Sequence, residues 1–229
     1  MAFTMIKVFM MKLSALALAT GLAFSSSAFA TINAWDSAST PWGSATITDY
    51  AEWNEFSWDS VSDNNFTDAT PDVAGSGTLT ATGTPTITST DNIYSWQENA
   101  TSYNAVLNTS STGVFDVYLR VAVLGLEPST TAYLNGVAAT AVETFYQYNG
   151  TQFGLVDAER EYYFLWSDVS VDSNLTFTWT DLTAHTSLDQ LALATVAVAA
   201  VPEPSTYGML ALGLGVLAYA GRRSRKNNA

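Results

Sequence analysis

The central part of the chain alternates apolar and polar positions with the period of two that is typical of β-strands. Residues 162–171 and 188–198 are also apolar and of strand length, and the second run is apolar on both faces, as in a covered strand. A run over 175–180 places threonine on its outer face. The clearest alternation covers residues 115–123, with Phe115, Val117, Leu119, Val121 and Val123 on one face.

Turn-forming residues separate these runs. Asn135-Gly136 and Asn149-Gly150 each supply the positive φ angles that a two-residue hairpin requires. Glu127-Pro128-Ser129 and Asp172-Ser173-Asn174 mark further turns, and the polar stretch 59–78 is predicted to be a long loop. No long segment keeps a 3.6-residue period. We therefore expect an all-β domain, an antiparallel β-sandwich of jelly-roll kind with about nine to eleven strands.

The first 30 residues have the three parts of a secretory signal peptide. Lys7 and Lys12 make a basic start, the run 13–24 is apolar, and Ala28 and Ala30 form an Ala-x-Ala site. The apolar run is too short to span a bilayer comfortably. We expect residues 1–30 to form a signal helix, and we expect signal peptidase to cleave after Ala30.

The other end of the chain also has three ordered parts. A linker over 199–205 contains Pro202, Glu203 and Pro204, and the prolines delay any helix until after Pro204. Residues 206–221 are apolar and predict a short transmembrane helix of about 24 Å. Residues 222–229 form a basic tail that should stay cytoplasmic. Its positive charges are Arg222, Arg223, Arg225 and Lys226.

This Pro-Glu-Pro motif, apolar helix and basic end resemble the PEP-CTERM sorting signal of exopolysaccharide-producing bacteria. The resemblance implies that a membrane-embedded exosortase processes the tail near the motif and passes the protein to the surface or matrix. Residues 31–198 would then form a β-sandwich domain outside the cytoplasm of a Gram-negative-type bacterium, with only transient membrane anchoring. The resemblance also implies a place at the cell surface, in the exopolysaccharide of a biofilm.

Charge and cysteine content limit the classes of function. All 21 acidic residues lie between Asp36 and Glu203, and only Arg120 and Arg160 are basic within that span. Such a domain repels nucleic acid, so no nucleic-acid partner is expected. The chain has no cysteine, which excludes disulfides, thiolate catalysis and cysteine-ligated metals. Gly75-Ser76-Gly77 precedes a strand-like run without a lysine, which argues against a phosphate-binding loop.

Catalytic candidates are few. The single histidine, His185, is predicted to be an exposed loop residue, because no Gly-x-Ser-x-Gly elbow supports a Ser-His-Asp triad. Asp157, Glu159 and Glu161 alternate, which places them on one side of a strand. We interpret them as a solvated face, with Arg160 relieving their repulsion. Paired carboxylates for glycoside hydrolysis remain an alternative.

A calcium ion is the only cofactor that the sequence leaves open. Asp59, Asp63 and Asp68 offer oxygen ligands, but Asp63-Asn64-Asn65 lacks the glycine and the glutamate of an EF-hand loop. Our expectation is therefore no cofactor, with calcium as the alternative.

Five tryptophans lie outside the obvious strands, and exposed aromatic rings stack on the apolar faces of sugars. Core packing is the competing interpretation. Residues 133–136 and 188–193 faintly resemble β-sandwich carbohydrate-binding modules, which makes polysaccharide a further expected partner. The five tryptophans are Trp35, Trp42, Trp53, Trp58 and Trp96.

The sequence as a whole favours a non-enzymatic exported protein with a structural or interaction role at the surface or in the matrix. Signal peptidase, exosortase and the membrane are its expected partners. A carbohydrate-binding module is the first alternative, and a glycoside hydrolase or lyase is the second.

Overall fold

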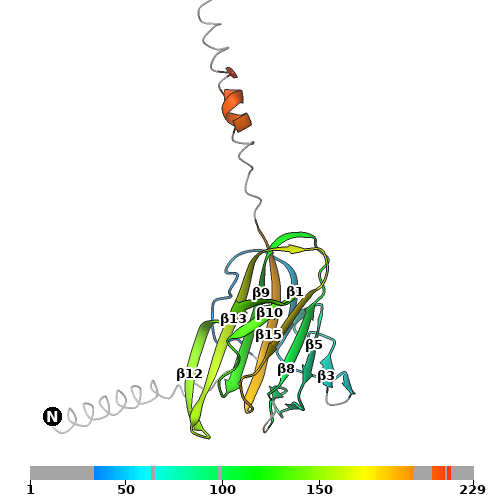
Figure 1. The fold of residues 1–229 in the computed structure, drawn as a ribbon, viewed down its shortest axis with the longest axis vertical. Helices are drawn as coiled ribbons and strands as arrows, with labels where there is room; N and C mark the ends of the chain where they lie inside the picture. The colour runs from blue at the N-terminus through cyan, green and yellow to red at the C-terminus, as the bar shows by residue number, and fades with distance from the viewer. Residues whose placement is uncertain (1–33, 63–64, 97–99, 199–207, 215, 218–229) are drawn as a thin grey trace, which may run out of the picture.

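A computed structural model describes residues 34–62, 65–96, 100–198, 208–214 and 216–217 of the chain. The described strands pair only in antiparallel fashion and form two sheets that run along the length of the domain (Figure 1). The β-sandwich expected from the alternation is thus confirmed, while its jelly-roll kind stays a prediction. The signal peptide lies outside the described residues.

The larger sheet has the order β12-β13-β9-β15-β1-β4, and β7 joins it by pairing with both β15 and β6. Its central strands are long because their apolar faces are covered along most of their length. The strands are β1 (Ile47–Trp53), β4 (Ala74–Gly75), β6 (Thr86–Ile87), β7 (Ile93–Tyr94), β9 (Gly113–Gly125), β12 (Val142–Gln152), β13 (Leu155–Val171) and β15 (Thr186–Ala197).

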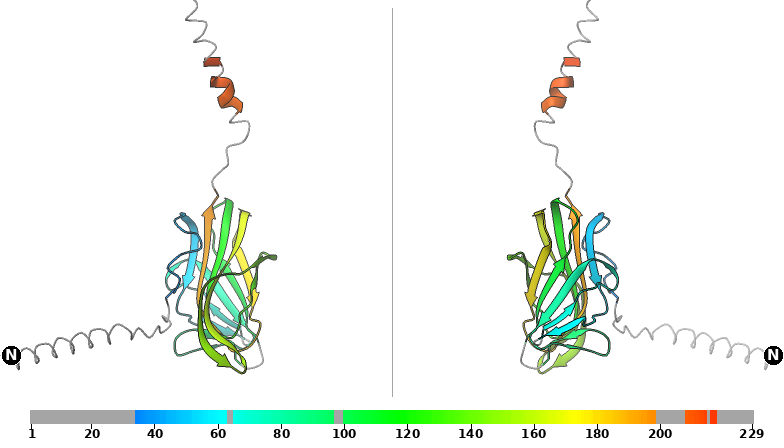
Figure 2. Two further views of the ribbon diagram at one scale, coloured as in Figure 1. Left: turned by 90° about the vertical axis from the view of Figure 1, so that its left-hand side faces the viewer. Right: turned by 90° about the vertical axis from the view of Figure 1, so that its right-hand side faces the viewer.

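The second sheet has the order β11-β10-β14-β8-β5-β3-β2 and packs against the first one. Large side chains fill the space between the sheets, among them the fully buried Trp53, Phe164 and Phe177. The strands are β2 (Ser60–Ser62), β3 (Asn65–Asp68), β5 (Gly77–Thr82), β8 (Ser102–Leu107), β10 (Thr131–Leu134), β11 (Val137–Thr140) and β14 (Leu175–Thr180). The side views in Figure 2 show both sheets within one domain.

Two turn predictions have different outcomes. Asn135 and Gly136 have φ angles of 48° and 86° and join β10 to β11, as the sequence predicted. Asn149-Gly150 does not form a turn, and that prediction was wrong. Strand β12 continues through it with a register shift between Tyr148 and Gly150, because the glycine accommodates a bulge.

The prediction of a long loop over 59–78 was also wrong. Strands β2, β3 and β4 lie inside this stretch, and β5 begins at Gly77. These strands are short and polar, so alternation could not indicate them. Their hydrogen-bonded neighbours β1 and β5 provide the partners that hold them extended.

The predicted transmembrane helix is described only in part. Residues 208–214 and 216–217 are helical and exposed, and the ends of the predicted segment 206–221 lie outside the described residues. Nowhere in the described chain is there a helical stretch with the length and apolar character that a membrane crossing requires. The membrane-spanning role of this segment stays a prediction.

Candidate functional site: an aromatic surface at one end of the sandwich

The five tryptophans singled out in the sequence have different surroundings. Trp53 is fully buried, Trp58 packs against the core, and Trp35 and Trp42 are partly buried. Trp96 differs from all of them because 52% of its surface is exposed. Core packing therefore explains most of these residues, and Trp96 is the one available to a ligand.

Trp96 belongs to a cluster of four rings that we call the Trp96 surface: Tyr94, Trp96, Phe153 and His185. Its ring lies 5.6 Å from that of Tyr94 and 6.5 Å from that of His185. Phe153 approaches His185 from the other side, with 4.6 Å between the ring centroids. These residues come from β7, from the β12–β13 hairpin and from the turn before β15, so the fold brings three separate segments together.

His185 is held firmly in this cluster. Its Nδ1 shares a hydrogen bond of 2.6 Å with the Tyr94 hydroxyl, and its backbone N–H donates to the carbonyl of Ser95. The residue has a φ angle of 66°, which is uncommon for a non-glycine residue. The sequence placed His185 in a loop, which is right, but its exposure was overestimated because the side chain is half-buried beneath neighbouring rings.

Gly125 at the end of β9 permits the position of His185. Its φ angle is +107°, and a Cβ there would lie 2.3 Å from the carbonyl oxygen of His185. We expect Gly125→Ala to cost about 2–3 kcal/mol and to lower the melting temperature by roughly 5–10 °C. Gly136→Ala is the matched control, since Gly136 has a φ of +86° and open space around it. Equal melting temperatures for the two variants would contradict the close-contact argument.

Phe153 lies at the tip of the β12–β13 hairpin in an unfavourable conformation. Gln152 pairs with Leu155, so Phe153 and Gly154 form a two-residue turn with φ angles of 54° and 80°. A left-handed conformation costs an ordinary residue about 1–2 kcal/mol. Phe153 also leaves 72% of its surface exposed. Its contact with the His185 ring is the stabilising interaction that offsets this cost in part.

A buried polar network lies next to the Trp96 surface. The hydroxyl of Ser95 lies 2.6 Å from Asp181 Oδ2 and 2.7 Å from Thr101 Oγ1, and the Tyr103 hydroxyl donates to the same Asp181 oxygen. Burial raises the pKa of Asp181 to about 7. Ser95 directly precedes Trp96, so this network fixes the backbone from which the tryptophan projects. The aspartate binds Ser95 and the histidine binds Tyr94, so the described contacts do not assemble a Ser-His-Asp triad.

A shallow hollow adjoins the tryptophan. It has a volume of about 450 Å³ and is lined by Thr84, Pro85, Thr86 and Trp96. The two threonines can donate and accept hydrogen bonds beside the exposed ring. Flat rings and hydroxyl groups thus occur together in the Trp96 surface and the hollow.

The carboxylates of β13 lie elsewhere, on the outer face of the larger sheet. Their placement on one side of the strand was predicted correctly, but the prediction that this side is solvated was wrong. Glu159 and Glu161 are 4% and 1% exposed, because residues 34–37 cross the sheet above them. Arg160 projects to the other side of the strand, toward Tyr146. The cation that relieves the repulsion is instead Arg120 of the neighbouring strand β9.

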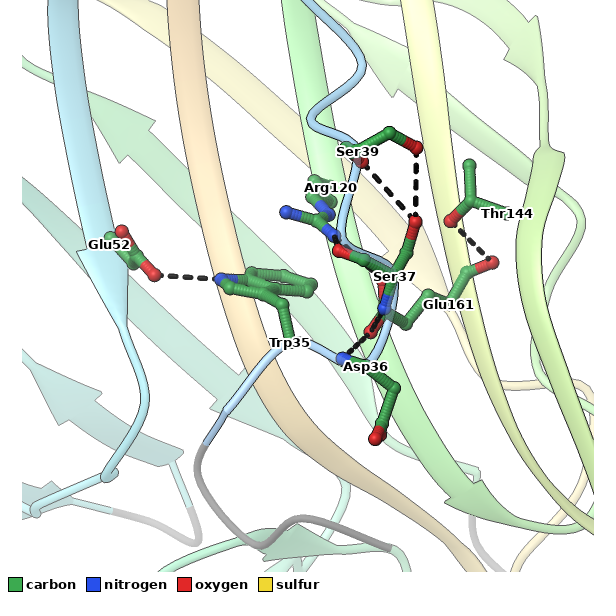
Figure 3. A network of polar contacts seen from close by, with 8 residues as sticks. All are labelled: Trp35, Asp36, Ser37, Ser39, Glu52, Arg120, Thr144 and Glu161. Carbon is green, nitrogen blue, oxygen red and sulfur yellow. Dashed lines mark hydrogen bonds and ion pairs between the residues drawn. The ribbon is translucent and has the colours of Figure 1, made fainter.

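Figure 3 shows how the segment before β1 is attached to this face. The Arg120 guanidinium forms an ion pair of 2.8 Å with Glu161 and donates to the carbonyl of Ser37. Glu161 also accepts hydrogen bonds from the backbone N–H groups of Asp36 and Ser37. Trp35 stacks on the guanidinium at 3.9 Å and donates to Glu52. We call this set of contacts the Arg120 lock.

Two carboxyl groups near the Arg120 lock hold their protons unusually tightly. Burial raises the pKa of Glu159 to about 8, and the hydrogen bond with Asp36 and the charges of Asp36, Asp189 and Glu161 add to the shift. Burial also raises the pKa of Asp189 to about 6, although a hydrogen bond with Asn92 opposes this. The covered face therefore carries less negative charge at neutral pH than its composition implies.

The aspartates considered as calcium ligands have structural partners instead. Asp68 is fully buried and accepts hydrogen bonds from the N–H groups of Ser57 and Thr70. Asp59 accepts a bond from the N–H of Ala69, and Asp63 lies outside the described residues. The described residues contain no group of three or more candidate ligands arranged to hold a metal ion.

The predicted processing residues all lie outside the described part of the chain. They are Ala28, Ala30, Pro202, Glu203, Pro204, Arg222, Arg223, Arg225 and Lys226.

Comparison with known families identifies the C-terminal part. Residues 200–226 match the family model of the PEP-CTERM protein-sorting motif, which confirms the resemblance read from the Pro-Glu-Pro, apolar and basic segments. The chain thus carries a PEP-CTERM sorting motif, which implies an exported surface protein that an exosortase sorts. The chain matches none of the curated proteins and none of the solved structures with which it was compared.

Proposed function

We propose that this PEP-CTERM protein acts at the cell surface or in the extracellular matrix as a non-enzymatic structural or interaction protein. The observation that carries the proposal is the sorting motif at 200–226, which follows directly on the last strand of the β-sandwich. The tail delivers the domain, and the domain then acts by contact.

The route follows from the ends of the chain. Signal peptidase removes residues 1–30, and the apolar segment 206–221 holds the protein in the membrane for a short time. The basic residues after it stay on the cytoplasmic side, which leaves the sandwich outside. Exosortase then processes the tail near Pro202 and releases the domain to the surface.

The arrangement of the carboxylates favours contact over catalysis. A glycoside hydrolase needs two carboxyl groups on either side of an accessible bond. Glu159 has the raised pKa of a proton donor, yet both it and Glu161 lie beneath the segment that the Arg120 lock holds in place. A substrate would have to displace this segment first, so the hydrolase or lyase alternative has little support.

Removal of the tail tests the delivery route. A chain without residues 202–229 should lose membrane retention and surface display, and should accumulate as a free exported domain. Surface biotinylation of fractionated cells measures the difference, and a chain in which only Arg160 is changed serves as a control with an intact tail. Surface display of the truncated chain at the wild-type level would refute the sorting role.

A further inference from the structure

We propose that the Trp96 surface binds an uncharged polysaccharide, with the sugar rings stacking on Trp96 and Phe153. The inference rests on the proposed function, because it names the partner of a domain that acts by contact. It concerns a place on the sandwich that the sorting motif does not involve.

The exposure of these two rings to water is energetically unfavourable. Exposed apolar groups of this size are unusual when they gather at one place. Trp96 and Phe153 are 52% and 72% exposed, and Phe153 also adopts a positive φ angle. Asparagine or glycine would suit that turn position better. A phenylalanine there is understandable if its exposed face has a ligand.

The groups on and around the rings match the chemistry of a sugar. A sugar ring offers an apolar face of C–H groups and an edge of hydroxyl groups. The faces of Trp96 and Phe153 match the apolar face of the sugar. The hydroxyl edge of the sugar can form hydrogen bonds with Thr84, Thr86 and the imidazole of His185, beside the open hollow.

The charge of the described surface favours a neutral polymer over an anionic one. Both arginines of the described domain are buried, Arg120 at 3% and Arg160 at 6% exposure. The described surface therefore offers no side-chain cation for a carboxylate or sulfate group, and the acidic domain repels such groups over a distance. An uncharged chain avoids this repulsion.

The size of the site favours a polymer strand over a folded protein. A stable protein interface involves about 20–30 residues on each side. The four rings of the Trp96 surface and the three other residues of the hollow make a much smaller area. A few sugar units cover such an area, and a long polymer increases retention by offering many equivalent segments.

The location of the surface fits this role. Strand β15 begins at Thr186, next to His185, and ends at Ala197, after which the chain continues toward the sorting motif (Figure 1). Twelve residues of extended strand separate the two points, or about 36 Å. The Trp96 surface thus lies at the end of the sandwich opposite the attachment to the tail, where it can reach a surrounding polymer.

The test uses the full chain, purified in mild detergent, on an array of neutral and acidic glycans and in affinity gels that contain hydroxyethylcellulose, dextran or alginate. We expect binding to at least one neutral polysaccharide, weakened about tenfold or more by Trp96→Ala and by Phe153→Asn. The asparagine variant suits the positive φ angle, so its loss of binding would not reflect unfolding. Tyr133→Ala, which removes an exposed ring from the other sheet, should bind normally.

Three outcomes would overturn the proposal: no binding to any neutral glycan, a preference for alginate, or neutral-glycan binding that both variants retain. Circular dichroism of each variant shows whether it is folded. Because binding is measured on purified protein, it does not depend on delivery in the cell. A failure of sorting and a failure of glycan binding are therefore distinguishable.

Discussion

Arg120→Met should destabilise the domain by about 3–5 kcal/mol, because it leaves the carboxylate of Glu161 buried without a counter-charge. The same change removes the cation beneath Trp35 and a hydrogen bond to the carbonyl of Ser37. The segment before β1 should therefore exchange its amide hydrogens faster than the rest of the domain. Urea unfolding measures the first effect, and hydrogen exchange at residues 34–42 measures the second.

Two further variants distinguish the effect of losing the ion pair from the effect of losing side-chain volume. The double variant Arg120→Met with Glu161→Met replaces both charges by apolar groups and should recover much of the lost stability. Arg160→Met removes the other buried arginine, which has no ion pair among the described residues, and should cost at most about 1–2 kcal/mol. A double variant no more stable than Arg120→Met alone would contradict the role of the uncompensated charge.

The free energy of unfolding should fall as the pH rises from about 5 to 8.5. Glu159, Asp181 and Asp189 have pKa values of about 8, 7 and 6 in the folded state, against ordinary values of 4.5, 3.8 and 3.8. Between these limits the folded protein keeps protons that the unfolded chain has released. The contribution of these three carboxyl groups to the free energy of unfolding is therefore complete below about pH 4. It is lost as the pH rises through the folded pKa values.

The expected loss is on the order of 5–8 kcal/mol over this range, measured by urea unfolding at a series of pH values. Above about pH 7 the remaining slope should come chiefly from Glu159, so Glu159→Gln should flatten it. Gln147→Ala is the matched control, since Gln147 pairs with Glu159 and does not titrate. A wild-type profile that is flat from pH 6 to 8.5 would disprove the argument.

Alternation predicted those strands that have one face in the core. The run 188–198 was predicted from its continuous apolar character and largely coincides with β15. The alternating runs are 115–123, which lies within β9, and 175–180, which is β14. Their odd or even positions meet the second sheet, so the physical cause of the pattern is local to each strand. Short strands such as β3 depend on hydrogen bonds to β5, and no local sequence pattern indicates this pairing.

The covered face and the aromatic surface were harder to predict because distant segments create them. Glu161 is buried by residues about 125 positions earlier in the chain, and no nearby residue signals this. Phe153 carries the missed signal of the Trp96 surface, since a phenylalanine-glycine pair is a poor turn sequence. The nearby Asn149-Gly150 pair is a better turn sequence, and the hairpin was therefore predicted at the wrong position.

The position of β15 has a mechanical consequence for a force applied at its C-terminal end. The strand lies between β9 and β1, so hydrogen bonds secure it along both edges. Tension applied at Ala197 along the strand would load these two ladders in shear. The bonds must then fail together instead of one after another, as they would at an edge strand. The central position of β15 therefore suits the sandwich to resist tension along this strand, which the proposed polysaccharide binding would produce.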